Sequence, residues 1–223
     1  MKIFDIKWQA NTAGPTPPRY NNYRTELFLF GCNRAKEGRP CKGCFNSMIW
    51  DDSIVQKTYS AHEVADKIIK YAPNKYVTIG GGEPTDQFEE LIELSRILHD
   101  NGFHIMVYTW KNLMQLSNSE SPDSVHFHNL MKYVDMIVDG EYDYTKRLYN
   151  ENKNDGLLNS IGSGNQTVWY KTSCSDHIIF TGYKMDNIKS LSYDENNFLV
   201  VDAINPKDHH FIIWSQDEDT VYN

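Results

Sequence analysis

Short apolar runs alternate with amphipathic stretches along residues 25–140, and this alternation constrains the fold more than any other feature. Four apolar runs predict strands at residues 25–30, 75–79, 104–110 and 134–140. Between them, apolar residues at helical spacing predict helices at residues 60–72, 86–102 and 125–133. Strands that alternate with helices form right-handed βαβ units around a parallel sheet. We therefore expect an α/β protein.

Turn and cap residues mark the boundaries of these elements. Residues 11–22 contain three prolines and a glycine, so they predict a loop. Ser60 and Glu63 have the spacing of a capping box at the start of a helix. Gly102 follows the second predicted helix as a C-cap, and the polar residues 117–124 predict a loop.

The last part of the chain has a different pattern. Apolar runs at residues 177–180, 198–201 and 211–214 are separated by polar turns rich in Asn and Asp, and they predict short strands. We expect residues 1–170 to form the core domain and residues 171–223 to form a small β-rich C-terminal extension. The extension either adds to the sheet and covers its edge or docks a second protein.

Composition and charge exclude several classes of protein. The net charge is −8 and there is no long basic run, which argues against a nucleic-acid binder. We expect no signal peptide and no membrane-spanning helix, because the N-terminus lacks an apolar core region and no apolar run approaches eighteen residues. The expected location is the cytoplasm, where clustered cysteines bind metals or take part in catalysis more often than they form disulfides.

Three of the four cysteines, Cys32, Cys41 and Cys44, lie within thirteen residues. A structural zinc site needs four ligands, and no second C-x2-C pair follows. Cys174 is distant in sequence, and the histidines that could serve instead lack the spacing of a zinc knuckle: His126, His128, His209 and His210. A [4Fe–4S] cluster is usually held by four thiolates, so three would leave one iron open to another ligand.

The candidate site loops all follow predicted strands. They are the cysteine loop, the "GGGEP" segment (Gly80–Pro84), the residues "YTW" (108–110) and the residues "VDG" (138–140). Ligands of parallel α/β sheets bind at the carboxyl ends of the strands. The sequence therefore predicts that these loops converge on one site.

Three clustered cysteines after a first strand, followed by "GGEP" after the next strand of the sheet, resemble the radical S-adenosylmethionine enzymes. The usual spacing in that family is C-x3-C-x2-C, and here the first gap has eight residues. The resemblance implies an incomplete, open α/β barrel with one [4Fe–4S] cluster held by Cys32, Cys41 and Cys44. It also implies that the open iron binds the methionyl group of S-adenosylmethionine, which is cleaved to methionine and a 5′-deoxyadenosyl radical.

A narrower resemblance rests on five motifs in order: "LFLFGC…CKGCFNSMIW", "IGGGEP", "VYTW", "IVDGEY" and "GSGNQ" (Gly162–Gln166). Together they are similar to the activating proteins of anaerobic (class III) ribonucleotide reductases, over roughly residues 20–170. This implies an enzyme whose substrate is the large subunit of the reductase, on which it generates a glycyl radical. It also implies a low-potential electron donor such as a flavodoxin or a ferredoxin.

The resemblance implies roles for residues at each loop. The backbone at Gly43, Cys44 and Phe45 would lie against the adenine, although the Phe45 ring could equally pack in the core. At Gly81, Gly82 and Glu83, glycine would let the backbone approach the ligand, so that carbonyl groups accept hydrogen bonds from the methionine ammonium. The alternative for this segment is a plain turn.

Thr109 and Asp139 end the third and fourth strands, and the resemblance implies that both face the cavity. Asp139 would bond the methionyl amine or the ribose. Glu141 stands where relatives often carry a basic residue, and Gly162–Gln166 would close the cofactor site or the partner surface. Alternative functions remain: an activase of a different glycyl-radical enzyme, a 7-carboxy-7-deazaguanine synthase-like enzyme, or a zinc-binding interaction module.

Overall fold

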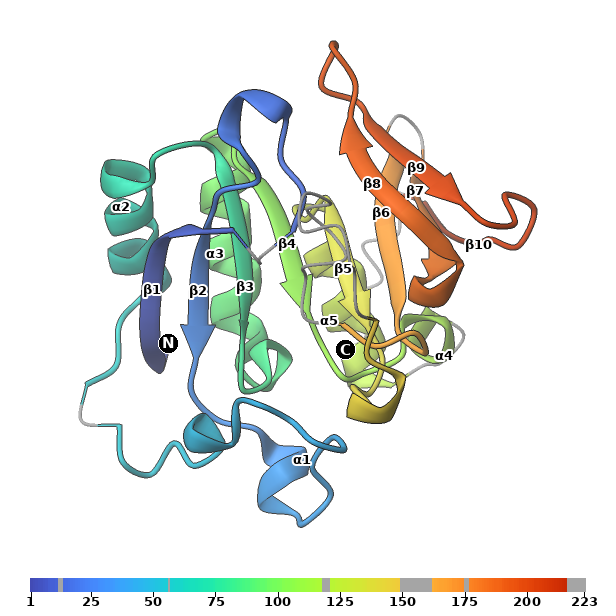
Figure 1. The fold of residues 1–223 in the computed structure, drawn as a ribbon. Helices are drawn as coiled ribbons and strands as arrows, with labels where there is room; N and C mark the ends of the chain where they lie inside the picture. Colours follow the sequence, from blue (N-terminus) through green and yellow to red (C-terminus); the bar gives the residue numbers. More distant parts are fainter. Residues whose placement is uncertain (12–13, 56, 118–120, 149–161, 175–176, 216–223) are drawn as a thin grey trace.

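The structure is a computed structural model that describes residues 1–11, 14–55, 57–117, 121–148, 162–174 and 177–215 (Figure 1). Its centre is an eight-stranded sheet with the order β1-β2-β3-β4-β5-β6-β7-β10. The strands are β1 (Ile3–Ala10), β2 (Arg24–Leu29), β3 (Tyr76–Gly81), β4 (His104–Tyr108), β5 (Met136–Asp139), β6 (Thr167–Cys174), β7 (His177–Lys184) and β10 (His210–Ser215).

The strands β2, β3, β4 and β5 are parallel, which confirms the parallel sheet predicted from the alternation of strands and helices. All other pairs in this sheet are antiparallel, including β1 with β2 and β5 with β6. Strand β1 was not predicted, although residues 5–10, "DIKWQA", alternate between polar and apolar, and only its last residue, Ala10, is buried. It is an edge strand, so one of its sides lacks a neighbouring strand.

Helices cover one face of the sheet, and in Figure 1 α3 and α5 lie behind it. The helices are α1 (Asn33–Lys36), α2 (Ala61–Tyr71), α3 (Phe88–Asp100), α4 (Leu113–Ser117) and α5 (Pro122–Met131), and short 3₁₀ turns occupy Pro18–Tyr20, Ser47–Ile49, Pro84–Gln87, Tyr144–Lys146 and Met185–Asn187. Within the described ranges, no helix is long and apolar enough to span a bilayer.

The helix boundaries follow local capping chemistry. The predicted capping box of α2 is present, since Ser60 accepts a hydrogen bond from the Glu63 N–H and Glu63 accepts one from the Ser60 N–H. Helix α5 begins inside the stretch that was predicted to be a loop. Ser121 caps it and Pro122 occupies its first position, where a missing N–H costs no hydrogen bond.

Side chains of the parallel strands alternate between two hydrophobic clusters. Residues such as Leu27, Ile79 and Val107 point outward and pack against the helices. Residues such as Met106 and Val138 point to the inner face, where a second cluster forms. This period of two is the expected consequence of the strand pleat.

The C-terminal region adds strands in two places. Strands β7 and β10 continue the main sheet beyond β6, so the boundary expected at residue 170 falls inside β6. A separate hairpin of β8 (Ile188–Tyr193) and β9 (Leu199–Ala203) packs its apolar residues against the inner cluster, in front of the sheet in Figure 1. The molecule is therefore the incomplete α/β barrel that was expected, with a β-rich C-terminal addition.

Candidate functional site

An open cleft with an empty volume of about 840 Å³ lies where the parallel strands end. Each predicted site loop contributes to it: Cys32, Cys41, Cys44 and Phe45 after β2, Gly80–Pro84 after β3, Tyr108–Trp110 after β4, and Gly140 after β5. The predicted convergence of these loops on one site is present in the structure.

All three clustered cysteines are free thiols on the wall of this cleft. The eight residues between Cys32 and Cys41 form α1 and a return turn, in which the Arg39 N–H donates to the Arg34 carbonyl at 3.0 Å. Cys44 N–H donates to the Cys41 carbonyl at 3.2 Å, so the C-x2-C pair makes a tight turn. The long first gap is thus accommodated by one extra helical turn.

Burial raises the pKa of the Cys32 thiol to about 11, and burial also raises the pKa of Cys41. The thiols are therefore protonated near neutral pH, and iron binding would release their protons. Thiolates are the ligands that iron–sulfur clusters use, and each thiolate of a cluster binds a different iron atom. Three thiols that line one cleft fit such a cluster.

A mononuclear site is not supported by the geometry. Among the residues described, no group of three His, Cys, Asp or Glu side chains is arranged to hold a single metal ion. Zinc needs four ligands around one point, so the zinc alternative has no support in this part of the chain. The side chain of Cys174 lies outside what the structure describes.

The glycines of the "GGGEP" segment approach the backbone of the protein itself. A Cβ atom at Gly82 would lie 2.0 Å from the Gly31 carbonyl oxygen, and one at Gly81 would lie 2.4 Å from the Leu29 nitrogen. Hydrogen bonds join the same segments, since Gly82 N–H donates to Leu29 O at 2.9 Å and Glu83 N–H donates to Gly31 O at 2.7 Å. The segment is therefore locked to the strand end that leads to Cys32.

One carbonyl of this segment already has a partner. Asn46, in the cysteine motif, donates from Nδ2 to the Gly81 carbonyl at 2.8 Å. A carbonyl oxygen has two lone pairs, so one remains for a ligand. Asn46 also lines the cleft, and its place in the C-x2-C-aromatic-Asn motif was the available signal for it.

Glu83 joins the ends of β3 and β4. It is 1% exposed, and its carboxylate accepts hydrogen bonds from the Thr85 N–H (3.1 Å), the Thr85 hydroxyl (2.5 Å), the Thr109 hydroxyl (2.8 Å) and the Trp110 N–H (3.0 Å). Burial raises the pKa of Glu83, while these bonds act in the opposite direction. Glu83 and Thr109 lie at the cleft as predicted, but they bond to each other.

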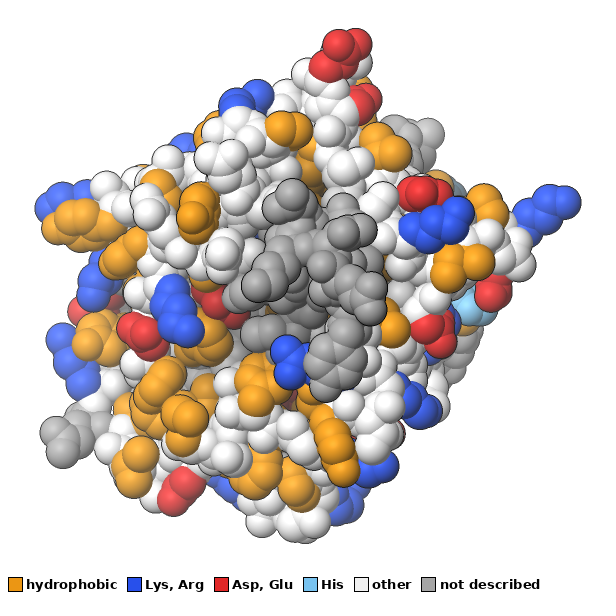
Figure 2. All heavy atoms as spheres, viewed as in Figure 1, with side chains coloured by type: hydrophobic (Ala, Val, Ile, Leu, Met, Phe, Trp, Pro, Cys, Tyr) orange, Lys and Arg blue, Asp and Glu red, His pale blue; other side chains and the backbone are white. Residues whose placement is uncertain are grey.

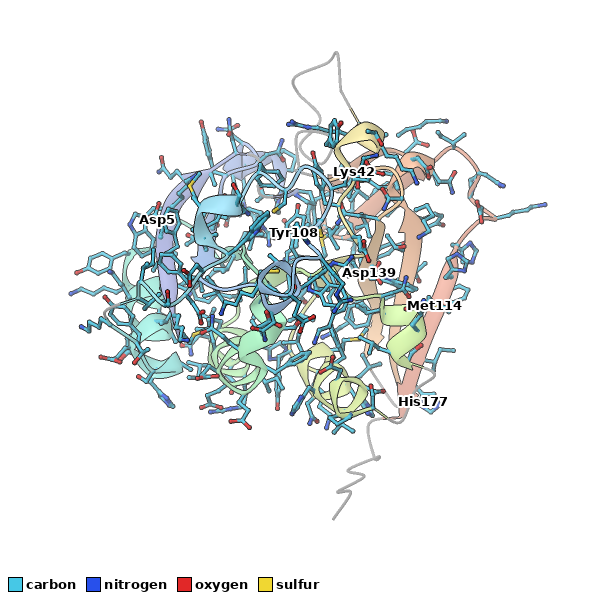
Figure 3. The ribbon with its side chains drawn as sticks, turned by 90° about the horizontal axis from the view of Figure 1, so that it is seen from below. Asp5, Lys42, Tyr108, Met114, Asp139 and His177 are labelled. Atoms are coloured by element: carbon cyan, nitrogen blue, oxygen red, sulfur yellow. The ribbon has the colours of Figure 1, made fainter. Side chains whose placement is uncertain are left out.

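Asp139 was expected to face the cavity, and its side chain is directed elsewhere. It ends β5, but it is 1% exposed and is not part of the cleft wall. Its Oδ2 atom accepts a hydrogen bond from the Leu113 N–H at 2.6 Å, at the start of α4, on the side of the labelled Met114 in Figure 3. Burial raises the pKa of Asp139 to about 6. Contact of this carboxylate with the methionyl amine or the ribose stays a prediction.

The "GSGNQ" segment docks onto the turn after β5. Gln166 lines the cleft, accepts a hydrogen bond from the Ser163 N–H at 3.0 Å and donates to the Gly140 carbonyl at 2.8 Å. Asn165 donates to the Glu141 carbonyl at 2.7 Å. The Glu141 carboxylate, whose contact the sequence left open, forms an ion pair with Arg34 of α1 at 2.6 Å.

Phe45 is 45% exposed and lines the cleft, so it is not a core residue. Its ring meets that of Tyr142 edge-on, with centroids 5.5 Å apart. Gly43 has a positive φ of 71°, and a Cβ atom there would lie 2.6 Å from the Tyr144 ring. Met48 and Tyr144 are also exposed, and hydrophobic side chains (orange) gather on the lower part of the face in Figure 2.

Sequence reasoning missed other residues of the cleft wall, namely Glu26, Phe28, Trp50 and Tyr142. Tyr108 also lines the cleft, and it is labelled near the centre of Figure 3, which shows the molecule from below. For Glu26 a signal was available, because an acidic residue interrupts the apolar run "TELFLF".

The chain is similar to known iron–sulfur proteins. The family model of the 4Fe-4S single cluster domain matches residues 21–169. The chain is also similar to the pyruvate formate-lyase-activating enzymes of Staphylococcus aureus strains USA300, NCTC 8325 / PS 47 and COL, each 28% identical over 171 residues. The matched region is 72% of this chain and 63% of each relative, so the chain spans less than two thirds of the length of these curated relatives. By the extent of the family match, the chain belongs to the family of 4Fe-4S single cluster domains.

Proposed function

We propose that this protein is a radical S-adenosylmethionine activating enzyme that generates a glycyl radical on the large subunit of anaerobic ribonucleotide reductase. The observation that carries the proposal is that three free cysteines and the Gly80–Pro84 segment line the same cleft. Membership of a 4Fe-4S family and similarity to activating enzymes support it.

Cys32, Cys41 and Cys44 would hold one [4Fe–4S] cluster and leave one iron for S-adenosylmethionine. When reduced by a flavodoxin or a ferredoxin, such a cluster would supply the electron that cleaves the sulfonium bond, and methionine would be released. The hydrogen atom removed from the glycine of the partner would leave in 5′-deoxyadenosine. The chain itself binds and orients the reactants. We propose that it does so in the cytoplasm, without nucleic acid or membrane.

The proposed cofactor contacts are those predicted from the sequence: Gly43, Cys44, Phe45, Gly81, Gly82, Glu83, Thr109 and Asp139. We propose that the Gly81 carbonyl, which already accepts a hydrogen bond from Asn46, accepts a second one from the methionine ammonium. We propose that Glu83 and Thr109, which bond to each other across the two strand ends, also hold these loops in position.

The choice of the reductase as the partner rests on the five motifs in order, above all "GSGNQ". Its residue Gln166 borders the cleft and is tied to the turn after β5. The exposed apolar residues around the mouth, Phe45, Met48 and Tyr144, support a protein substrate, since exposed apolar groups of this kind mark interaction surfaces.

A second candidate partner is pyruvate formate-lyase, because the relatives found by comparison are named for its activation. The two candidates are separated by one experiment. The protein is reconstituted with iron and sulfide without oxygen, reduced, and incubated with S-adenosylmethionine and either partner, and the glycyl radical is measured by electron paramagnetic resonance. We expect the radical on the anaerobic reductase. A radical on pyruvate formate-lyase alone would replace the partner, and absence of cofactor cleavage would refute the enzyme.

A further inference from the structure

Glu26 lies on the floor of the cleft. It is in the middle of β2, on the same inner face as Phe28, and it is 7% exposed. In the parallel register Glu26 pairs with Thr78 and Phe28 pairs with Gly80. Glu26 is therefore one layer of side chains further than Phe28 from the strand ends, where the cysteines lie.

The carboxyl group of Glu26 has no hydrogen bond or ion pair with any residue that the structure describes. Glu83 is the other acidic residue of the cleft wall, and both of its carboxylate oxygens accept hydrogen bonds from protein groups. Lys7, opposite Glu26 on β1, is exposed and holds its ammonium 4.8 Å from the Phe28 ring centroid. Arg24 is fully buried and donates to Pro15, Val77 and Thr78.

A carboxyl group that is buried without a partner lowers the stability of a protein. Burial raises the pKa of Glu26 to about 7, and the charge of Lys7 acts in the opposite direction. Lys7 attracts the carboxyl group from the facing position on β1 but forms no ion pair with it, so the carboxyl group has no hydrogen-bond donor among the described residues. A ligand in the cleft would supply such a donor.

Glu26 and the three cysteines line the same open cleft. Gly80 lies between them on β3 without a side chain, and a Cβ atom there would meet nothing nearer than Tyr108 at 3.9 Å. The proposed cofactor contacts all lie at the strand ends, one layer above Glu26. The lower part of the cleft is consequently open to a second molecule that approaches the cofactor from below.

We propose that Glu26 is a positioning residue for the polypeptide substrate, and that its carboxyl group accepts a hydrogen bond from a backbone N–H of the segment that carries the glycine. The inference rests on the proposed function. A backbone N–H is the donor that every such segment possesses, and a buried N–H needs an acceptor. This hydrogen bond would hold the segment near the cofactor and would give the carboxyl group of Glu26 a hydrogen-bond donor.

The test compares Glu26→Leu, Glu26→Gln and the control Glu90→Gln on the exposed side of α3. Each cluster-loaded protein is given S-adenosylmethionine and a reductant, with and without the anaerobic reductase. Three quantities are measured: cofactor cleavage without the partner, the glycyl radical yield, and the affinity for a synthetic peptide that spans the glycine. For Glu26→Leu we expect a loss of about tenfold in radical yield and peptide affinity, with uncoupled cleavage within about twofold of the unchanged protein. Glu26→Gln keeps an acceptor and should restore most of the loss.

A structural role would have a different signature. Removal of an unpaired buried carboxyl group should leave the melting temperature of Glu26→Leu equal or higher. Equal losses of uncoupled cleavage and radical yield would assign Glu26 to the cofactor, and unchanged peptide affinity would refute the inference. If the unsubstituted protein binds no cluster or cleaves no cofactor, the proposed function itself fails, and that result is visible before any variant is made.

Discussion

The position of Cys32, Cys41 and Cys44 in one cleft determines how these thiols can bind a metal cluster. The cysteines are close in sequence and line one cleft, and burial keeps two of the thiols protonated until metal displaces the protons. Glu83 has the opposite situation, because both oxygens of its carboxylate already accept hydrogen bonds from the protein. Asp139 is intermediate, since its Oδ2 atom accepts a hydrogen bond and its buried Oδ1 atom has no hydrogen-bond partner among the described residues. At the scale of single residues, the side chains that form few bonds to the protein are therefore the best candidates for binding a metal or a ligand.

Replacement of any one of the three cysteines by alanine should abolish the cluster. We expect about four irons per chain after anaerobic reconstitution of the unchanged protein and almost none in Cys32→Ala, Cys41→Ala or Cys44→Ala. Iron and sulfide content and visible absorbance measure this. Cys174→Ala is the matched control, and loss of the cluster in that variant would show that a fourth cysteine is a ligand.

The stability of the cluster-free protein should depend on pH through Glu26. The folded pKa is about 7 and the ordinary value is 4.5, so the folded state binds the proton more tightly. The resulting stabilisation is complete below pH 4.5 and is lost as pH rises through 7. By linkage the loss is at most about 3 kcal/mol. Urea unfolding of the protein and of Glu26→Gln between pH 4.5 and 8 checks this, because the difference between them should grow with pH. A constant difference would contradict the burial of the carboxyl group.

At the scale of elements, the joint between β2 and β3 holds the site together. The ends of both strands meet through Gly31, Gly81 and Gly82, and two backbone hydrogen bonds cross between them. The cysteine loop departs from one side of this joint and the "GGGEP" segment from the other. The position of each ligand group therefore depends on a backbone contact that only glycine permits.

Gly82→Ala should damage this joint and the cluster with it. Its Cβ atom would be placed 2.0 Å from the Gly31 carbonyl, so the backbone must move. We expect a loss of about 2–4 kcal/mol in the free energy of unfolding, in the range of strongly destabilising single substitutions. Gly80→Ala is the matched comparison on the same strand, since its Cβ meets only ordinary contacts and should cost less than about 1 kcal/mol. Chemical denaturation and iron content give both values, and equal stability of the two variants would contradict the close approach.

At the scale of the whole molecule, the C-terminal region completes the barrel core. Strands β7 and β10 continue the sheet, and the β8–β9 hairpin covers Met106, Met136 and Val138 on its inner face. Tyr193 of β8 also bonds His104 of β4 at 2.8 Å. The hairpin therefore covers the part of the inner face that Met106, Met136 and Val138 form.

A chain truncated after Tyr170 should therefore lose stability as well as any contact with a partner. The cut falls within β6 and exposes the apolar inner cluster, so we expect aggregation or unfolding at moderate temperature. A milder variant, Leu191→Asp, places a charge in the 5% exposed contact between hairpin and sheet and should cost about 2–4 kcal/mol. Circular dichroism melts measure both. A soluble truncated protein with an unchanged melting transition would show that the extension is an independent addition.

The sequence by itself determined the four parallel strands and the three long helices, the convergence of four loops, the capping of α2 and the three candidate cluster ligands. These depend on local periodicity, on cap residues and on the rule that parallel strands end at one edge. Only the tertiary structure decided that β1 and β6 flank the parallel strands, that Gly82 packs against Gly31, that Asp139 bonds to the start of α4, that the β8–β9 hairpin covers part of the inner face, and that Glu26 lacks a hydrogen-bond partner among the described residues. The physical reason is that these features depend on contacts between segments distant in sequence, and neither hydrophobic period nor residue type specifies such contacts.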